Sequence, residues 1–262
     1  MRLIKKTFVN IAVGLVIIGI ALMLAGVAFG GRLLDFGSGD TTSITDEFED
    51  VGSLVIEIDA GSLRIERGEG FAVKAEDVYE SAFESSLKDG VLTIRNKIRP
   101  ATMMFGNLHL GLFPWTNPKS VVTVYIPDDA TLEIADLTVG AGKIAADGIR
   151  TGDIRIKVGA GEVVIDGLEA EDSTLDCGVG SIRINGAITG ESTIRCGVGE
   201  IRLDLEGDPK AYDYRIKVGL GSTRINDDIY SGSTDKTEKN DGATGRFDLD
   251  CGVGEIVLNI GE

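Results

Sequence analysis

The chain is short of the residues on which many enzyme active sites depend. Among its 262 residues there are one histidine, one tryptophan, three cysteines and five prolines. Catalysis by histidine has one candidate, His109, which has no serine or cysteine close to it in the sequence. One histidine and widely separated cysteines do not predict a zinc site. Because P-loop, EF-hand and calcium nonapeptide motifs are also missing, we predict no enzyme activity, no metal and no cofactor.

Positive charge is scarce as well. The 26 basic residues are outnumbered by 42 acidic ones, which gives a formal net charge of −16. Such a field repels nucleic acid, so we expect no nucleic-acid partner. No motif indicates a small-molecule substrate. The apolar content of 43% is too high for a disordered chain.

One long apolar run lies near the N-terminus, where residues 11–29 are all apolar or glycine. Nineteen residues in a helix span ~28 Å, which matches a bilayer core. Basic residues precede the run and acidic residues follow it. The positive-inside rule therefore predicts a cytoplasmic tail (1–6), a transmembrane helix (7–31) and an acidic extracytoplasmic stalk (32–50). The predicted location is the cell membrane, with a single pass, the N-terminus in the cytoplasm and the C-terminal domain outside. A cleaved signal peptide is the alternative, because Gly26-Val27-Ala28 resembles a cleavage site.

Glycine is abundant, with 36 copies, and many belong to a repeated G-x-G motif. The motif begins at Gly140, Gly159, Gly178, Gly197, Gly219 and Gly252. The first four copies are 19 residues apart, and the next two intervals are 22 and 33 residues. A short fixed period predicts a solenoid, in which each repeat buries its apolar face against its neighbours.

The residues around each motif predict strands. Counted from the first glycine, positions −3, −1 and +1 are apolar in every copy, and the pattern resumes at +4 and +6. Alternation with a period of two indicates a strand with one face inward, and the glycines permit a bend. Position +7 is Asp or Asn in every copy, which indicates a turn. Each coil should contain two short strands, a glycine corner and an Asx turn.

The predicted fold is therefore mostly β: a parallel, β-helix-like solenoid of ~19-residue coils after one transmembrane helix. Residues 51–130 are expected to form a less regular β-rich part, in which Asp59 replaces a first glycine. Residues 131–262 are expected to form the G-x-G repeats, with the polar segment 227–246 as a surface loop.

The serial G-x-G-x-I-x-I coils, the strand ending in Tyr125-Ile126-Pro127 and the N-terminal apolar run resemble the LiaG-like putative adhesin family over about residues 50–262. Members of that family are bacterial envelope domains of unknown function with β-strand repeats. The resemblance implies exposure at the cell surface and association with envelope stress. It supplies no catalytic residue. Segments 101–115 and 227–246 depart from the plain repeat.

Two groups of residues are candidates for contact with a partner. Segment 101–115 has no charged residue, so it predicts either a cap over one end of the solenoid or a contact with a membrane or membrane protein. Its candidate residues are Met103, Met104, Phe105, Phe113 and Trp115. At position +5, a predicted arginine ladder could bind an anionic glycan or phosphate, or form a solvated face with glutamates. It consists of Arg183, Arg202 and Arg224.

The three cysteines share position −1, where the other copies have valine. This interchange favours core packing, although Cys177 and Cys196 on adjacent coils would lie within disulfide range. The predicted function is a membrane-anchored structural or adhesin-like interaction module of the bacterial cell envelope, with an envelope protein or glycan as partner. The alternative is an accessory or sensory ectodomain of an envelope-stress system. A polysaccharide-acting β-helix enzyme is disfavoured because the acidic side chains alternate with basic ones at outward positions.

Overall fold

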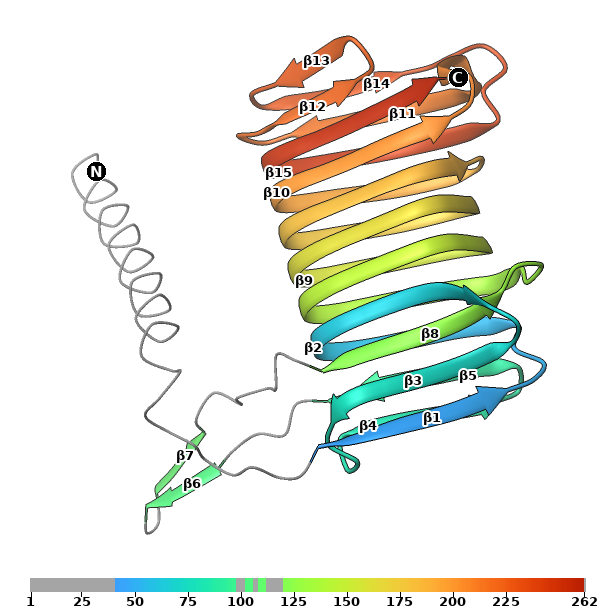
Figure 1. Ribbon diagram of the computed structural model, residues 1–262. Helices are drawn as coiled ribbons and strands as arrows, with labels where there is room; N and C mark the ends of the chain where they lie inside the picture. The colour runs from blue at the N-terminus through green and yellow to red at the C-terminus, as the bar shows by residue number, and fades with distance from the viewer. Residues whose placement is uncertain (1–40, 98–101, 106–107, 112–119, 262) are drawn as a thin grey trace. The chain divides into compact units, whose positions relative to one another are not determined.

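The computed structural model describes residues 41–97, 102–105, 108–111 and 120–261. Within these ranges the chain is almost entirely β-strand, which confirms the mostly β fold (Figure 1). Thirteen strands form one sheet that winds into stacked rungs. They are β1 (Thr42–Phe48), β2 (Ser53–Gly68), β3 (Phe71–Val78), β4 (Phe83–Lys88), β5 (Val91–Asn96), β8 (Val121–Pro127), β9 (Leu132–Ile188), β10 (Glu191–Glu206), β11 (Tyr212–Val218), β12 (Ser222–Ile225), β13 (Asp228–Ser231), β14 (Thr234–Glu238) and β15 (Gly245–Gly261).

The repeated coils pair in parallel at an offset of 19 residues. Between β10 and β9, Cys196 lies beside Cys177 and Ile201 beside Ile182. Strand β2 pairs with the first coil of β9, where Ile58 lies beside Val139. Asp59 therefore stands where later coils have their first glycine, as the sequence predicts. The result is a solenoid-like stack of parallel rungs (Figure 1).

The core fills the interior of this stack. In β10 the inward positions −3, −1, +4 and +6 are at most 2% exposed. They are occupied by Ile194, Cys196, Ile201 and Leu203. Equivalent side chains of successive rungs lie on one another, so the core is a column of Ile, Leu and Val along the whole stack. Position +1 is an exception, because its side chains point outward and not into the core.

The coils do not stack in the order of the sequence. The sheet runs from β9 through β10 and β15 to β11, so the C-terminal strand lies between β10 and the coil formed by β11 and β12. The chain leaves β10 at Glu206 and enters β11 at Tyr212, two rungs further along the sheet. A short 3-10 helix, η1 (Pro209–Ala211), lies within this step. Strand β15 then fills the rung that was skipped (Figure 1).

The N-terminal end is built from antiparallel strands. β1 pairs antiparallel with β3, and β3 pairs antiparallel with β8. Residues 42–48 were expected in the acidic stalk, but they form β1, in which Ile44 and Phe48 pack against the core. The short alternation of apolar and polar residues in this segment is sufficient for a half-buried strand.

The polar segment 227–246, expected as a surface loop, contains two strands. β13 pairs antiparallel with β12, and β14 pairs antiparallel with β11 at the C-terminal end of the sheet. Asp235 and Lys236 are exposed on β14. Charged side chains on an edge strand discourage the addition of a further strand, so β14 protects this end of the stack.

Segment 101–115 contributes a separate two-stranded antiparallel sheet of β6 (Thr102–Phe105) and β7 (Leu108–Gly111). Met103, Met104 and Phe105 lie on β6, whereas Phe113 and Trp115 lie outside the described residues. The predicted tail 1–6 and transmembrane helix 7–31 also lie outside them. Within the described ranges, no helix has both the length and the apolar character that a membrane crossing requires.

Candidate interaction surface

Each G-x-G corner turns the chain while the β pairing continues through it. Strand β9 passes through three corners without interruption. In the first four corners the second glycine has a positive φ, with 144° at Gly180 and 138° at Gly199. A Cβ atom at Gly199 would lie 1.9 Å from the carbonyl oxygen of Gly180 in the adjacent rung. The corner therefore requires glycine for its φ angle and for the close approach of the rungs.

The residue between the two glycines points to solvent, although the apolar pattern predicted that position +1 would face inward. Val179, Val198, Val253 and Leu220 are 56%, 49%, 52% and 85% exposed. The bend between the glycines reverses which side of the strand faces the core. In spatial order the exposed positions form a row, here named the corner row: Ala141, Ala160, Val179, Val198, Val253 and Leu220.

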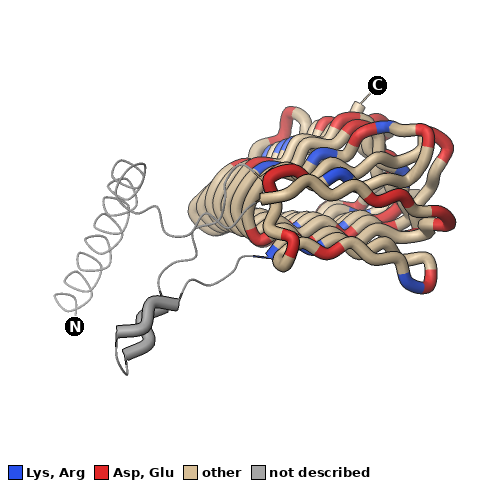
Figure 2. The backbone as a smooth tube through the Cα atoms, turned by 60° about the horizontal axis from the view of Figure 1, so that its bottom comes forward, with Lys and Arg blue, Asp and Glu red and all other residues tan. Residues whose placement is uncertain are grey.

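The side chains of the corner row project into solvent, because the residues before and after each of them are glycines. The band of corners contains few charged residues, as the mostly tan edge of the stack in Figure 2 shows. Large exposed apolar side chains scattered singly are ordinary, but an aligned row on a rigid edge indicates a contact surface. The sequence contained the signal, since position +1 is always Ala, Val or Leu, but its orientation required the backbone.

A ladder of alternating charge runs along one side of the corner row, at position −2. Arg195 pairs with Asp176 at 3.2 Å, and Arg95 pairs with Glu57 at 3.0 Å. Opposite charges on neighbouring strands contribute about 0.2–1 kcal/mol per pair. In spatial order the ladder reads Glu84, Arg95, Glu57, Thr138, Lys157, Asp176, Arg195, Asp250, Lys217 and Asp235.

The predicted arginine ladder at position +5 is only partly formed. Arg183 and Arg202 are neighbours in register, but Val257 of β15 separates Arg202 from Arg224. The prediction of three stacked arginines was wrong because β15 inserts between the two coils. Each guanidinium also has a carboxylate partner: Glu162 at 3.7 Å from Arg183, Glu200 at 3.5 Å from Arg202 and Glu255 at 3.2 Å from Arg224. This pairing favours the solvated face over an anion site.

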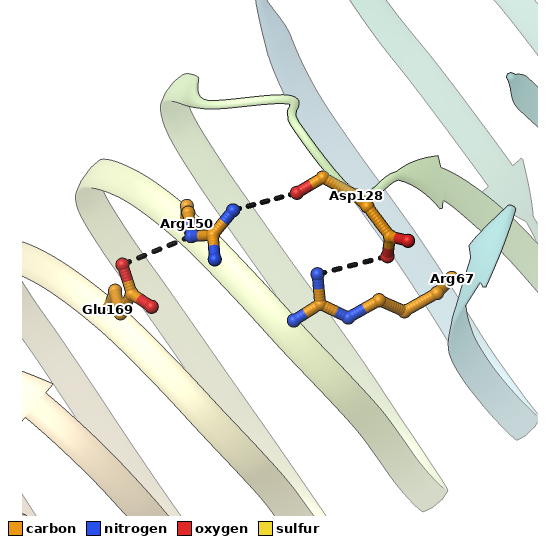
Figure 3. A network of polar contacts seen from close by, with 4 residues as sticks. All are labelled: Arg67, Asp128, Arg150 and Glu169. Carbon is orange, nitrogen blue, oxygen red and sulfur yellow. Dashed lines mark hydrogen bonds and ion pairs between the residues drawn. The ribbon is translucent and has the colours of Figure 1, made fainter. Parts of the chain in front are cut away.

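A second polar network ties the N-terminal strands to the first coils (Figure 3). Arg67 of β2 donates to the carboxylate of Asp128 at 3.2 Å. Arg150 donates to the Asp128 carbonyl oxygen at 2.7 Å and to Glu169 at 3.1 Å. Both guanidinium groups are thus paired within the chain, and their partly exposed positions make each contact worth little. The network connects strands and does not offer an anion site.

The Asp and Asn residues at +7 were expected to form Asx turns, but only Asn226 lies in a turn, and the other five lie within strands. Asn185 donates its side-chain amide to Asp166 at 2.6 Å and accepts from the Gly167 backbone amide at 2.8 Å. Where Asp and Asn are neighbours, as Asp166 with Asn185 and Asp204 with Asn259, an amide donor lies next to a carboxylate acceptor. Across the part of the chain that the structure describes, no group of three or more His, Cys, Asp or Glu is arranged to hold a metal ion.

Two depressions on the described surface are candidate ligand sites. One of about 180 Å³ lies along the charged ladder and is lined by Arg195, Lys217 and Asp250, among others. Another of about 660 Å³ lies at the N-terminal end beside Phe48, Phe71 and Tyr125. The first is lined by three basic and two acidic side chains, and Arg195 among them is paired with Asp176. The charged side chains of the second are all acidic: Glu47, Glu49 and Glu69. The corner row remains the strongest candidate.

The cysteines lie on three consecutive rungs of the core. Cys196 is beside Cys177 on one side and beside Cys251 on the other. All three are buried and free, which supports core packing over a disulfide. Burial raises the pKa of the Cys177 and Cys251 thiols, and it raises the pKa of Cys196 to about 12. At neutral pH these side chains are therefore uncharged apolar groups.

We expect all three thiols to resist a water-soluble disulfide reagent at pH 8 in the folded protein and to react fully after denaturation. The reason is that the reactive thiolate is suppressed and the sulfur atoms are covered. Because burial raises the pKa of Cys196, its contribution to stability is complete below the pKa of an unfolded thiol and is lost as pH rises toward about 12. Absorbance of the released thiol chromophore gives the count. Rapid modification of one equivalent without unfolding would contradict the buried ladder.

Comparison with known protein families assigns this chain to one of them. A model of the Toastrack DUF4097 family matches residues 51–208, which is more than half of the chain. The chain belongs to this family. The match covers the N-terminal β-rich part and the first four G-x-G coils, and it confirms the expected family of repeat domains of unknown function. No curated protein matches the chain.

Several solved structures are similar to this Toastrack chain. A putative cell adhesion protein from Clostridium sporogenes has 16% identity and a TM-score of 0.46, covering 85% of this chain and 99% of its own. A putative adhesin from Bacteroides fragilis has 11% identity and a TM-score of 0.37, covering 85% and 98%. A putative lipid binding protein from Parabacteroides distasonis has 11% identity and a TM-score of 0.31, covering 86% and 97%.

Proposed function

We propose that this Toastrack chain is a membrane-anchored interaction module of the cell envelope, held by residues 7–31 and displayed on the extracytoplasmic side. One observation carries the proposal: the corner row presents aligned apolar side chains on a rigid edge. An exposed row of this kind costs solubility, and contact with a partner offsets that cost.

The chemistry of the surface supports binding over catalysis. Acidic and basic side chains beside the corner row alternate and pair with one another, as Asp176 and Arg195 do. A pair of carboxylates prepared for general acid and base catalysis would need environments that separate their pKa values. The row itself contains no aromatic residue. It therefore suits the apolar surface of a protein better than a sugar ring, and we propose an envelope protein as the partner.

The anchor and the side of the membrane rest on the sequence. Arg2, Lys5 and Lys6 precede the apolar run, and the acidic domain follows it. A net charge of −16 also repels the domain from anionic headgroups, which leaves its surface free for a protein partner.

The test uses intact cells that produce the full chain with an epitope after Glu262. Protease added outside should remove the epitope, because the C-terminal end of the stack is extracytoplasmic. The same cells should bind to a layer of their own envelope material. The triple variant Val179→Ser, Val198→Ser and Val253→Ser should reduce this binding several-fold, because it removes the apolar row. Bound cells are counted by microscopy.

The matched control is Ile229→Ser, which removes an apolar side chain that is 68% exposed but lies on β13, outside the corner row. It should leave binding unchanged. Full protection of the epitope would reject the topology. Equal binding by the wild type and the triple variant would reject the corner row as the contact surface.

A further inference from the structure

The members of the corner row increase in size from one end of the stack to the other. Ala141 and Ala160 lie toward the N-terminal end, Val179 and Val198 lie in the middle, and Leu220 lies near the C-terminal end. The rungs repeat at ~4.8 Å, so six members make a row ~24 Å long. A second surface would fit against this row if it had the same spacing and its side chains decreased in size in the same direction.

A second copy of the chain, turned end for end, is such a surface. We infer that the corner row binds the corner row of a second copy in antiparallel orientation, with the two-fold axis between Val179 and Val198. Val179 then meets Val198 of the second copy, Ala160 meets its Val253, and Ala141 meets its Leu220. Two valines meet at the centre and an alanine faces a larger side chain on each side of it, so the two rows touch along their whole length.

The charged ladder beside the row matches in the same arrangement. Position −2 of each copy faces position −2 of the other, which places Asp176 opposite Arg195 and Lys157 opposite Asp250. Each pair occurs twice because of the two-fold axis. The ladder therefore pairs opposite charges between copies in addition to those within each chain.

On the other side of the row, at position +3, the arrangement brings Glu162 toward Glu255 of the second copy. Both carboxylates have cationic partners in their own chain: Lys143 at 3.2 Å from Glu162, and Arg224 at 3.2 Å from Glu255. This local neutralisation limits the repulsion between the copies.

The parallel arrangement fits less well. It would place Leu220 on Leu220 and Ala141 on Ala141. Contact between the two large leucine side chains would then keep the small alanine side chains from touching. The parallel arrangement would bring Asp250 toward Glu255 of the second copy, but also Arg195 toward Glu200 and Lys157 toward Glu162, so charge does not separate the two arrangements. The fit of side-chain sizes favours the antiparallel contact.

The contact is small. A row ~24 Å long and about one sheet spacing (~10 Å) wide buries a few hundred Å² on each copy, the size of a weak, transient interface. Many copies on two facing surfaces would reinforce it by multivalency. The two copies are proposed to belong to opposing membranes. This inference rests on the proposed function and names its partner as a second copy of the chain.

The test uses the full chain reconstituted into phosphatidylcholine vesicles of two colours, with clustering measured by fluorescence cross-correlation. Protease release of the epitope after Glu262 first establishes that the chain is displayed. Wild-type vesicles should cluster. Vesicles carrying only Asp176→Arg, or only Arg195→Asp, should cluster at least about tenfold less, because each variant then meets a like charge across the two-fold axis.

The decisive sample mixes the two variants. Asp176→Arg on one vesicle faces Arg195→Asp on the other, so opposite charges meet again and clustering should return toward the wild-type level. Arg150→Asp makes the same charge change as Arg195→Asp at the network of Figure 3 and should cluster like the wild type. The inference is overturned if displayed wild-type chains do not cluster, if either variant alone clusters like the wild type, or if the mixture fails to recover. Failure of display would instead reject the proposed anchor.

Discussion

Gly199→Ala is expected to destabilise the stack by several kcal/mol, one of the largest effects of adding a single methyl group to this chain. The new Cβ would meet the Gly180 carbonyl oxygen at 1.9 Å, and the residue would need a φ of 138°. A strained φ of this kind costs about 1–3 kcal/mol by itself, and separating two paired rungs adds to that. Thermal unfolding followed by circular dichroism at 218 nm would measure the loss.

Gly70→Ala is the matched control. A Cβ at Gly70 has no heavy atom within 4 Å, and the backbone does not have a positive φ there. This change should be neutral or slightly stabilising, by up to about 1 kcal/mol, because it restricts the unfolded chain. Equal melting temperatures for Gly199→Ala and Gly70→Ala would show that the rungs are not in the register described.

The rung register could be predicted from the sequence because the G-x-G spacing and the apolar alternation repeat together. A 19-residue offset placed Cys196 on Cys177, and the apolar match of Ile58 with Val139 extended the register to β2. Neighbouring coils bury equivalent positions, so one correctly aligned pair determines the rest. The core positions at −3, −1, +4 and +6 followed from the same pattern.

The order of the last coils could not be predicted from that pattern. The corners beginning at Gly219 and Gly252 have the same apolar positions, so either could follow the corner at Gly197. The charges at −2 do distinguish them: Lys217 directly on Arg195 would place two cations together, whereas Asp250 between them restores alternation. The charges at −2 therefore indicate the order of the last coils, but they can be interpreted in this way only when that order is known.

The candidate site was missed for a different reason. Alternation identifies apolar positions, but the side that a residue faces after a bend depends on the backbone of the bend. The backbone bends at each pair of glycines, so Val198 points outward although it is apolar like its neighbours. The opposite error affected β1, where acidic composition indicated a stalk although Ile44 and Phe48 alternate with polar residues as in a strand.

Removal of the inserted coil is expected to unfold the C-terminal end of the stack. A chain that ends at Thr244 lacks β15, which pairs with β10 on one side and with β11 and β12 on the other. It also lacks Phe247, which is fully buried and packs on the rings of Tyr212 and Tyr214 at 5.0 and 6.1 Å. Loss of the Phe247 side chain alone would cost about 3–5 kcal/mol.

The remaining strands cannot repair this gap by moving together. If β11 and β12 closed onto β10, Lys217 would meet Arg195 and Arg224 would meet Arg202. Each is a like-charge contact that β15 now prevents. A stack of rungs unfolds locally from a damaged end, so β9 should remain folded while β11 and β12 lose their structure. Amide hydrogen exchange of residues 212–225, compared with residues 151–165, would show this difference.

A synthetic peptide of residues 245–262 should restore exchange protection to residues 212–225 when it is added to the shortened chain. It supplies the missing rung, with Asp250 between the two cations and Phe247 against the two tyrosines. The same peptide with Asp250→Lys keeps the apolar residues but places three cations in a row, so it should protect less. The order of rungs described here requires both results. It is contradicted if residues 212–225 stay protected without any peptide, because β11 and β12 would then be stable without β15 beside them.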